Sequence, residues 1–413
     1  MTDRHSLTRR FAGFSGLQIL SALAPLALLP ILARAAGVAG WASLAAGQSV
    51  GILVAAFALY GWGVQGPALV AGASPEDRWT IYRSSLVSRG TVLAVTLPVG
   101  YALAVVIAAD GYTPLTVLMA CAQGIGALSP IWFAIGVGQP KVILFYDAGP
   151  RIVAVLVSAG ALLAGAPLVT YPLLLIAASV GGIAAFTHHQ RRAVGGRGYT
   201  FRQAREDVRR VLRSQASAAA TQIAGASYGS ATVAIVGLFA TTVATAEFAS
   251  GDKFYRFTLM VVVAAGNTFQ GWVAEHPYPR NRPRMLASLA SLGTIGTLGA
   301  LALAIAGPWA TGLLFGSDLS VDRATAVWFG VAFLGICLST SLGRHILVPL
   351  GRASQLFAAT LAGALVGLPA IAYLSRAYGA PGGAAGYAVS EVVGALVLVA
   401  VLVHRRPSAS AAR

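Results

Sequence analysis

Charged residues are scarce in this chain of 413 residues, where they make up 10% of the sequence while 57% is hydrophobic. A soluble globular chain carries roughly a quarter charged residues, so the composition excludes water as the main solvent. Five uncharged stretches each supply the ~20 apolar residues that cross a bilayer: 11–33, 91–109, 111–140, 152–187 and 285–317. The sequence therefore predicts an all-α polytopic membrane protein.

Residues suited to redox, metal or nucleotide chemistry are also few. The two cysteines, Cys121 and Cys337, fall inside predicted helices and suit small packing positions, not a disulfide or a metal site. The six histidines lie in or beside predicted cytoplasmic segments, without cysteine or carboxylate partners at metal-ligand spacing. The glycine-rich stretch 195–198 lacks the Gly-Lys-Ser/Thr of a P-loop. We expect no catalytic site, no metal, no cofactor and no ATP hydrolysis by this chain alone.

Turns divide the apolar part of the chain into twelve predicted crossings. Their ranges are 14–33, 40–62, 90–109, 115–136, 143–164, 169–187, 216–240, 247–272, 286–308, 324–342, 354–374 and 384–403. Because twelve is even, both termini lie on the same side of the membrane.

The net charge of +16 follows this division of the chain. Twenty-three Lys and Arg residues share the side of the N-terminus, whereas the other side holds Arg34, Arg323 and Arg376. Cytoplasmic loops retain Lys and Arg, so the asymmetry predicts a plasma-membrane (inner-membrane) protein with both termini in the cytoplasm. Topology accounts for the basic excess, and we expect no nucleic-acid partner.

One substantial loop lies at the middle of the chain and separates two sets of six crossings. We expect an N-terminal six-helix bundle over 1–187, a cytoplasmic amphipathic crossover loop over 188–215 and a C-terminal six-helix bundle over 216–413. Since six is even, the two bundles would be related by a pseudo-twofold axis along the membrane normal. Within the loop, Phe201 and Val208 share a helical face opposite arginines, which predicts a helix lying among anionic headgroups.

The few charges inside the predicted spans are the candidate site, because each costs ~2.5–3.5 kcal/mol to insert and by default faces a cavity. Asp147 precedes Arg151 by four residues, as Asp252 precedes Arg256, so each acid can pair with its base along one helical face. Lys253 and Glu391 have no evident local partner.

Two interpretations of these charges remain open. In the first, Arg151, Lys253 and Arg256 attract an anionic substrate into a central cavity. Asp147, Asp252 or Glu391 would then carry a coupling proton or cation. In the second, the charges form structural ion pairs without a ligand. Arg34 at an outer helix end either contacts substrate or extends its side chain to lipid phosphates.

Four stretches resemble one transporter family: 30–42 continuing to 61–66, Pro130-Ile-Trp-Phe-Ala-Ile-Gly136 followed by Arg151, Glu247 to Arg256, and Leu350-Gly-Arg352 followed by 378–391. Their order and spacing are similar to those of the polysaccharide-unit flippases, or O-antigen transporters. This family belongs to the multidrug/oligosaccharidyl-lipid/polysaccharide exporter superfamily.

The resemblance implies two six-helix bundles that open alternately to each side of the membrane. The substrate it implies is an undecaprenyl-diphosphate-linked oligosaccharide moved from the inner to the outer leaflet, with membrane lipids, a polysaccharide polymerase and chain-length proteins as partners. Its charged positions match Arg34, Arg151, Lys253, Arg256 and Glu391. The sequence departs from the family in placing acidic residues beside most of these bases.

Three alternatives stay open beside this interpretation. A drug/cation antiporter of the same superfamily would favour an acidic, aromatic-lined cavity. A polysaccharide polymerase or ligase would need a large outward loop, and a membrane acyltransferase would need an intramembrane histidine. The predicted topology has neither feature, which disfavours these enzymes. A peptidoglycan-precursor flippase is closer, although this chain looks short for its extra helices.

Overall fold

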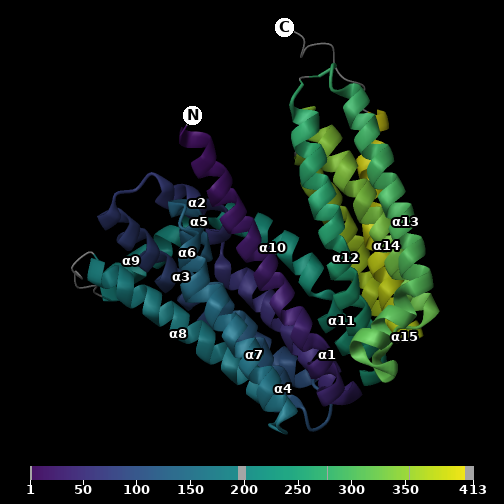
Figure 1. Ribbon diagram of the computed structural model, residues 1–413, viewed down its shortest axis with the longest axis horizontal. Helices are drawn as coiled ribbons and strands as arrows, with labels where there is room; N and C mark the ends of the chain where they lie inside the picture. Colours follow the sequence, from purple (N-terminus) through teal and green to yellow (C-terminus); the bar gives the residue numbers. More distant parts are fainter. Residues whose placement is uncertain (1, 194–200, 277, 353, 405–413) are drawn as a thin grey trace. The chain divides into compact units, whose positions relative to one another are not determined.

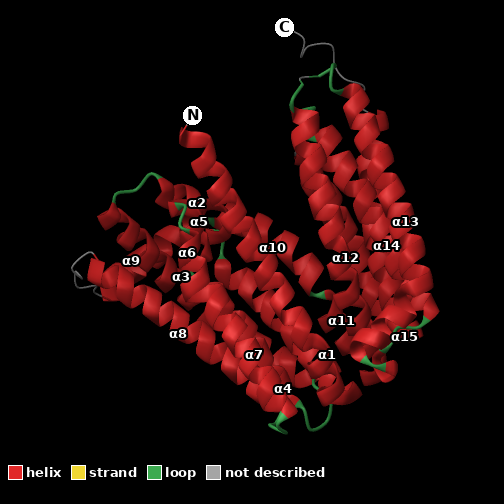
Figure 2. Cartoon of the chain, viewed as in Figure 1, coloured by secondary structure: helices red, strands yellow, loops and turns green. Residues whose placement is uncertain are grey.

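The computed structural model describes residues 2–193, 201–276, 278–352 and 354–404. Arg197, Arg405, Arg406 and Arg413, which contribute to the charge asymmetry, lie outside these residues. Every regular element in the described part of the chain is helical, and it contains no strand (Figure 2). The prediction of an all-α fold is confirmed.

The chain folds as two compact units, Met1–Ala231 and Thr232–Arg413, shown by colour in Figure 1. The first unit contains α1 (Thr2–Leu59), α2 (Trp62–Ala71), α3 (Pro75–Ile107), α4 (Thr113–Ile125), η1 (Gly126–Leu128), α5 (Ile131–Val137), α6 (Pro140–Ile143), η2 (Leu144–Ala148), α7 (Gly149–Leu163), α8 (Thr170–Ala193), α9 (Phe201–Ser214) and α10 (Ala216–Ser230). The second contains α11 (Thr232–Phe239), α12 (Thr242–Ala274), α13 (Arg282–Phe315), η3 (Ser317–Leu319), α14 (Arg323–Thr340), η4 (Ser341–Leu347) and α15 (Ser354–His404).

Two of the long helices each contain a sharp turn that makes them two crossings. Gly37 in α1 has φ 60° and Gly379 in α15 has φ 63°, and both values favour glycine because it lacks a Cβ. The described residues form twelve crossings when α1 and α15 are each counted as two helices and consecutive segments such as α4 and α5 are counted as one. Large apolar side chains point outward from them, and Leu163 and Ile305 are more than 70% exposed. Lipid, not water, is the solvent that suits such a surface.

The third crossing begins well before the predicted start at residue 90. Ser74 caps α3 by accepting a hydrogen bond from the amide of Asp77, Pro75 occupies the first turn, and Glu76 follows it. Those are strong helix-start signals, so the helix extends beyond its apolar part. As a result Arg89, predicted to lie in a loop, is inside a helix.

A cluster of aromatic residues fills the core of the first unit where α2, α3, α5 and α8 meet. Tyr82 packs edge-on against Phe133 and Phe186, with ring centroids 5.8 and 5.1 Å apart. Val211 of the amphipathic helix α9 belongs to the same cluster. The predicted amphipathic helix therefore places part of its apolar face on protein, while its arginines Arg202, Arg205 and Arg209 stay exposed.

The seventh crossing is broken between Ser230 and Thr232, where α10 ends and α11 begins. The hydroxyl of Ser49 on α1 donates to the carbonyl of Ser230, which gives this carbonyl a partner outside the helix. The boundary between the two compact units falls at this break, so α10 belongs to the first unit and α11 to the second. The domain boundaries at 187 and 216 stay a prediction from the sequence.

Small residues hold the eleventh and twelfth crossings together within α15. A Cβ added to Gly367 would lie 2.2 Å from the Cβ of Ser390, and one added to Gly386 would lie 2.5 Å from the backbone of Ile371. The hydroxyl of Ser390 donates to the carbonyl of Gly363 at 2.7 Å. This close packing, with Gly363 and Gly367 four residues apart, fixes the helix that carries Glu391.

Candidate functional site

In the first unit, the predicted pair of Asp147 and Arg151 is present. Arg151 Nη2 lies 3.4 Å from Asp147 Oδ1, and their side chains are 35% and 10% exposed. Asp147 belongs to the π-helical segment η2, and Arg151 is the third residue of α7. The acid is thus largely buried, while its base retains accessible surface.

Arg151 lies against the break in the fourth crossing, between α4 and α5. A Cβ added to Gly126 would lie 2.9 Å from Arg151 Nη2, so the guanidinium occupies space that only glycine leaves open. Tyr171 on α8 is close enough to interact with this guanidinium electrostatically. Arg151 Nε is buried and has no hydrogen-bond partner among the described residues. It is a donor that a bound anion or water could satisfy.

Arg89 reaches the same break from α3. Its Nη1 donates to the carbonyl oxygens of Ala127 and Ser129 at 2.7 and 3.0 Å, and its guanidinium lies 5.7 Å from the centroid of the Trp132 ring. The residue is 0% exposed. Because a broken helix leaves carbonyl groups without partners, this arginine replaces the missing helical hydrogen bonds. Sequence reasoning missed its role by assigning it to a loop.

Arg34 is exposed near the end of the first crossing, one turn before the kink at Gly37. It takes part in a polar or electrostatic interaction. Its position at a helix end fits either of the two roles predicted for it, contact with substrate or with lipid phosphate.

In the second unit, the predicted pair of Asp252 and Arg256 is closer than the pair in the first. Arg256 Nε lies 2.7 Å from Asp252 Oδ2, and the side chains are 42% and 6% exposed. Asp252 Oδ1 is buried and without a hydrogen-bond partner among the described residues. A buried carboxylate oxygen in that state is suited to accept a proton or a cation.

Aromatic rings connect α12 to α14 and α15 beside this pair. The ring of Tyr255 lies 5.4 Å from that of Phe329 and 5.5 Å, edge-on, from that of Tyr387. Tyr387 interacts electrostatically with Arg256, Asp252 and Glu391. The structure thus brings together Asp252 and Arg256 of the eighth crossing and Glu391 of the twelfth, which are more than 130 residues apart in the chain.

Glu391 is 9% exposed and lies where α15 approaches α14 closely. A Cβ added to Gly335 would come within 2.9 Å of the Glu391 Cβ, so the absence of a side chain there sets the depth at which this carboxylate is held. Lys253 and Glu391, for which the sequence shows no evident local partner, both take part in polar or electrostatic interactions. Lys253 interacts with Asp252 and with Arg256.

Charged residues of both units lie at the same distance from the start of their own helical segments. Arg151, Lys253 and Glu391 each lie eleven residues after the start of their helical segment, at Pro140, Thr242 and Ala380. At 1.5 Å per residue this is ~16 Å, about half the thickness of a hydrocarbon core. Formal charges in the second-unit set cancel, since it contains two bases, Lys253 and Arg256, and two acids, Asp252 and Glu391.

His345 is the second buried ionisable residue whose environment the sequence did not indicate. It lies in η4, is 0% exposed, and its Nε2 donates to the carbonyl of Gly266 on α12 at 2.9 Å. The sequence places it only in or beside a predicted cytoplasmic segment. The burial of His345 could have been inferred from the length of the apolar run that precedes it. Together α14 and η4 form one candidate membrane span, Arg323–Leu347, which includes this histidine. No group of three or more His, Cys, Asp or Glu side chains in the described ranges could hold a metal ion.

Solved structures with a similar fold are membrane transporters. The inward-closed structure of the lipid II flippase MurJ aligns with a TM-score of 0.72 over 94% of this chain and 87% of that chain, at 11% identity. The chain has the fold of the MOP superfamily transporters. An inward-facing multidrug resistance MATE family transporter of that superfamily aligns with a TM-score of 0.59 at 16% identity, over 92% of this chain and 96% of that chain.

A mutant of the Vibrio cholerae MATE transporter VcmN aligns with a TM-score of 0.52 at 13% identity, over 98% of this chain and 99% of that chain. No protein-family model matches the chain, and no curated protein matches it either. At these identities the likeness establishes the fold alone, two bundles of six transmembrane helices. The polysaccharide-unit flippase family stays a prediction.

Proposed function

We propose that this protein flips an undecaprenyl-diphosphate-linked oligosaccharide repeat unit from the inner to the outer leaflet of the inner membrane, for surface polysaccharide synthesis. The observation that carries the proposal is the placement of Arg151, Lys253 and Arg256 at hydrocarbon depth, on a fold shared with a lipid II flippase. Cations are costly there, and a diphosphate is a ligand that repays the cost. Both termini would lie in the cytoplasm.

The geometry of the two pairs supports a substrate role beyond mutual neutralisation. Arg151 and Arg256 are 35% and 42% exposed, whereas their acids are nearly buried. Each guanidinium is paired with a carboxylate, and the exposed part of each arginine side chain is accessible to a ligand. A diphosphate can therefore add to the pair without displacing the acid.

Coupling to an ion gradient would use the acidic members of the two sets. Asp252 has a buried oxygen without a hydrogen-bond partner in the part of the chain that the structure describes, and Glu391 lies close to Tyr387 within the second unit. Protonation or cation binding at Asp147, Asp252 or Glu391 would change the charge that the basic residues present to the substrate. Alternating access would link that change to movement of the substrate.

Mass spectrometry of undecaprenyl-linked glycans tests the proposal in cells with and without the gene. Accumulation of one complete repeat unit on its carrier in the deletion strain is the expected result, and its mass identifies the glycan. Accumulation of lipid II instead would point to the substrate named for the similar flippase. An unchanged lipid pool together with altered sensitivity to cationic dyes would favour the drug antiporters of similar fold.

A further inference from the structure

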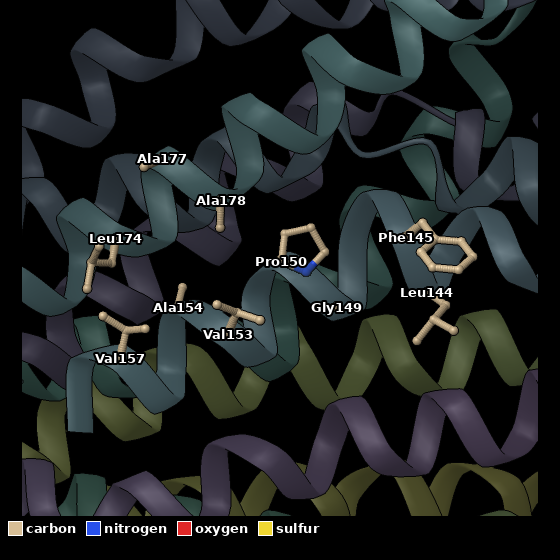
Figure 3. Close-up of a pocket in the computed structure, with 10 residues that line it drawn as sticks. All are labelled: Leu144, Phe145, Gly149, Pro150, Val153, Ala154, Val157, Leu174, Ala177 and Ala178. Atoms are coloured by element: carbon tan, nitrogen blue, oxygen red, sulfur yellow. The ribbon is translucent and has the colours of Figure 1, made fainter. Parts of the chain in front are cut away.

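An apolar groove lies between the fifth and sixth crossings, on the first unit. Its volume is about 480 Å³, and the residues that define it are Leu144, Pro150, Val153 and Val157 on η2 and α7, with Leu174 and Ala178 on α8 (Figure 3). Val153 and Val157 are 58% and 51% exposed. The groove therefore opens toward lipid and lies outside the charged site.

The backbone creates this groove locally. The segment Leu144–Ala148 is π-helical, which widens the turn, and Pro150 follows Ala148 after one glycine. A Cβ added to Gly149 would lie 2.4 Å from the carbonyl oxygen of Leu144, so the widened turn admits no side chain there. On the facing helix, Ala178 is too small to fill the space.

The length of the groove suits an extended chain more than a compact ligand. Leu144 and Val157 are thirteen residues apart, which is ~20 Å along a helix and about two-thirds of a ~30 Å hydrocarbon core. A hydrocarbon chain can lie along such a slot and bury apolar surface over its whole length.

Basic side chains lie at one end of the groove. Lys141 is exposed and precedes Leu144 by three residues and Phe145 by four, so it lies on the same face one turn away. On α8 the exposed Arg192 follows His189, whose ring lies 6.1 Å from that of Tyr146. This contact keeps the basic end of α8 beside the start of the groove. This end of the groove lies on the side that the distribution of Lys and Arg predicts to be cytoplasmic.

We propose that the groove between α7 and α8 binds the isoprenoid chain of a polyprenyl (di)phosphate, with its phosphate against Lys141 and Arg192. This inference rests on the proposed function and deepens it by giving the carrier lipid a place on the outside of the first unit. An amphiphile with an anionic head and a single long chain complements an apolar slot with a cationic end. The saccharide would then enter the charged site while the chain remains in lipid.

The test uses a photoreactive undecaprenyl phosphate and the full-length protein in phosphatidylcholine nanodiscs, with labelled peptides identified by mass spectrometry. We expect label on the peptides that carry Leu144 to Val157 and Leu174 to Ala178. Filling the groove with Ala178→Phe or Val157→Trp should lower that label about tenfold, the factor that corresponds to loss of 1.4 kcal/mol of binding. Val157 is half-exposed, so this second variant keeps the test valid if Ala178→Phe fails to fold.

Val180→Phe is the matched control, since Val180 is 49% exposed on α8 and does not line the groove. It should leave the label unchanged, while Lys141→Gln should lower it. Unchanged label in both groove-filling variants overturns the inference. So does dilution of the label by phosphatidylglycerol as effective as dilution by unlabelled undecaprenyl phosphate, because the groove would then be an ordinary lipid site.

Failure of the proposed function would look different. If deleting the gene leaves every undecaprenyl-linked glycan unchanged while groove-filling variants lose the label, the lipid site stands and the transport assignment falls. If the repeat unit accumulates in the deletion strain but the label ignores the groove, the transport assignment stands and this inference is wrong.

Discussion

The guanidinium of Arg89 on α3 donates to the carbonyl of Ala127, 2.7 Å away, where the fourth crossing is broken. A second hydrogen bond, to the carbonyl of Ser129, comes from the same nitrogen. The broken segment includes Gly126, against which Arg151 lies. Arg89 thus stabilises the helix break by hydrogen bonds, and Arg151, a candidate substrate-binding residue, packs against the same break.

Replacing Arg89 with methionine should destabilise the protein strongly. Each carbonyl left without a partner costs about 1–3 kcal/mol, and the side chain is fully buried. Arg89→Lys should destabilise the protein less than Arg89→Met, because an ammonium retains the charge and donors but lacks the planar guanidinium that lies over the Trp132 ring. Thermal unfolding in detergent measures the effect. Arg205→Met, at an exposed position on α9, should change the unfolding temperature little; an equally small change for Arg89→Met would refute the role.

Removing the cations at hydrocarbon depth in the second unit should impair transport without reducing the amount of protein in the membrane. We expect Lys253→Ala or Arg256→Ala to lower the rate at least about tenfold, which corresponds to ~1.4 kcal/mol of lost substrate interaction. The control is Arg323→Ala, which removes the same charge from an exposed helix start. Normal transport in both variants would sink the proposed role of these side chains.

A double substitution separates a substrate contact from a structural ion pair. If Arg256 serves only to neutralise Asp252, removing both charges should restore what either single variant loses, since the 2.7 Å pair would then be self-contained. We expect instead that Asp252→Asn with Arg256→Gln restores stability but not transport. Paired measurements of unfolding temperature and flipping rate decide between these outcomes.

Neutralising Glu391 should remove ion dependence while leaving substrate binding in place. Glu391→Gln keeps the shape of the side chain, so uptake into proteoliposomes should no longer respond to an imposed pH or sodium gradient. Glu247→Gln is the control, because Glu247 Oε1 accepts hydrogen bonds from the amide of Asp322 and the hydroxyl of Thr325. That variant should lose stability and keep its gradient response. A gradient response retained by Glu391→Gln would exclude this residue as the coupling group.

The close contact between α14 and α15 gives a packing prediction. Gly335→Ala places a methyl group 2.9 Å from the Glu391 Cβ, and overpacking of this kind costs about 1–3 kcal/mol. Gly293→Ala should be tolerated, since the nearest atom to its new Cβ would be Leu338 Cδ2 at 3.9 Å. Equal unfolding temperatures for the two variants would contradict the packing described here.

The sequence by itself predicted the membrane crossings and the ion pairs between residues of the same helix. Lipid offers no partner to a backbone amide or carbonyl, so an apolar run of sufficient length must form a helix, and the run places that helix in the chain even where start signals extend it, as Ser74 does for α3. Asp147 with Arg151 and Asp252 with Arg256 were predictable for the same reason, because the helix repeat brings residues four apart onto one face. The likeness to solved flippase and MATE transporter structures confirms the predicted fold, and the structure contains both charge pairs.

Contacts between crossings were decided only by tertiary structure. Nothing in the local pattern distinguishes Arg89, buried against a helix break, from an arginine in a loop, because the break that it satisfies lies almost 40 residues further along the chain. The meeting of Tyr255 with Tyr387 depends likewise on how three helices pack, and that depends on glycines such as Gly335. Helix formation is local and is therefore encoded locally; the depth and neighbours of each charge depend on interhelical packing, which no single segment determines.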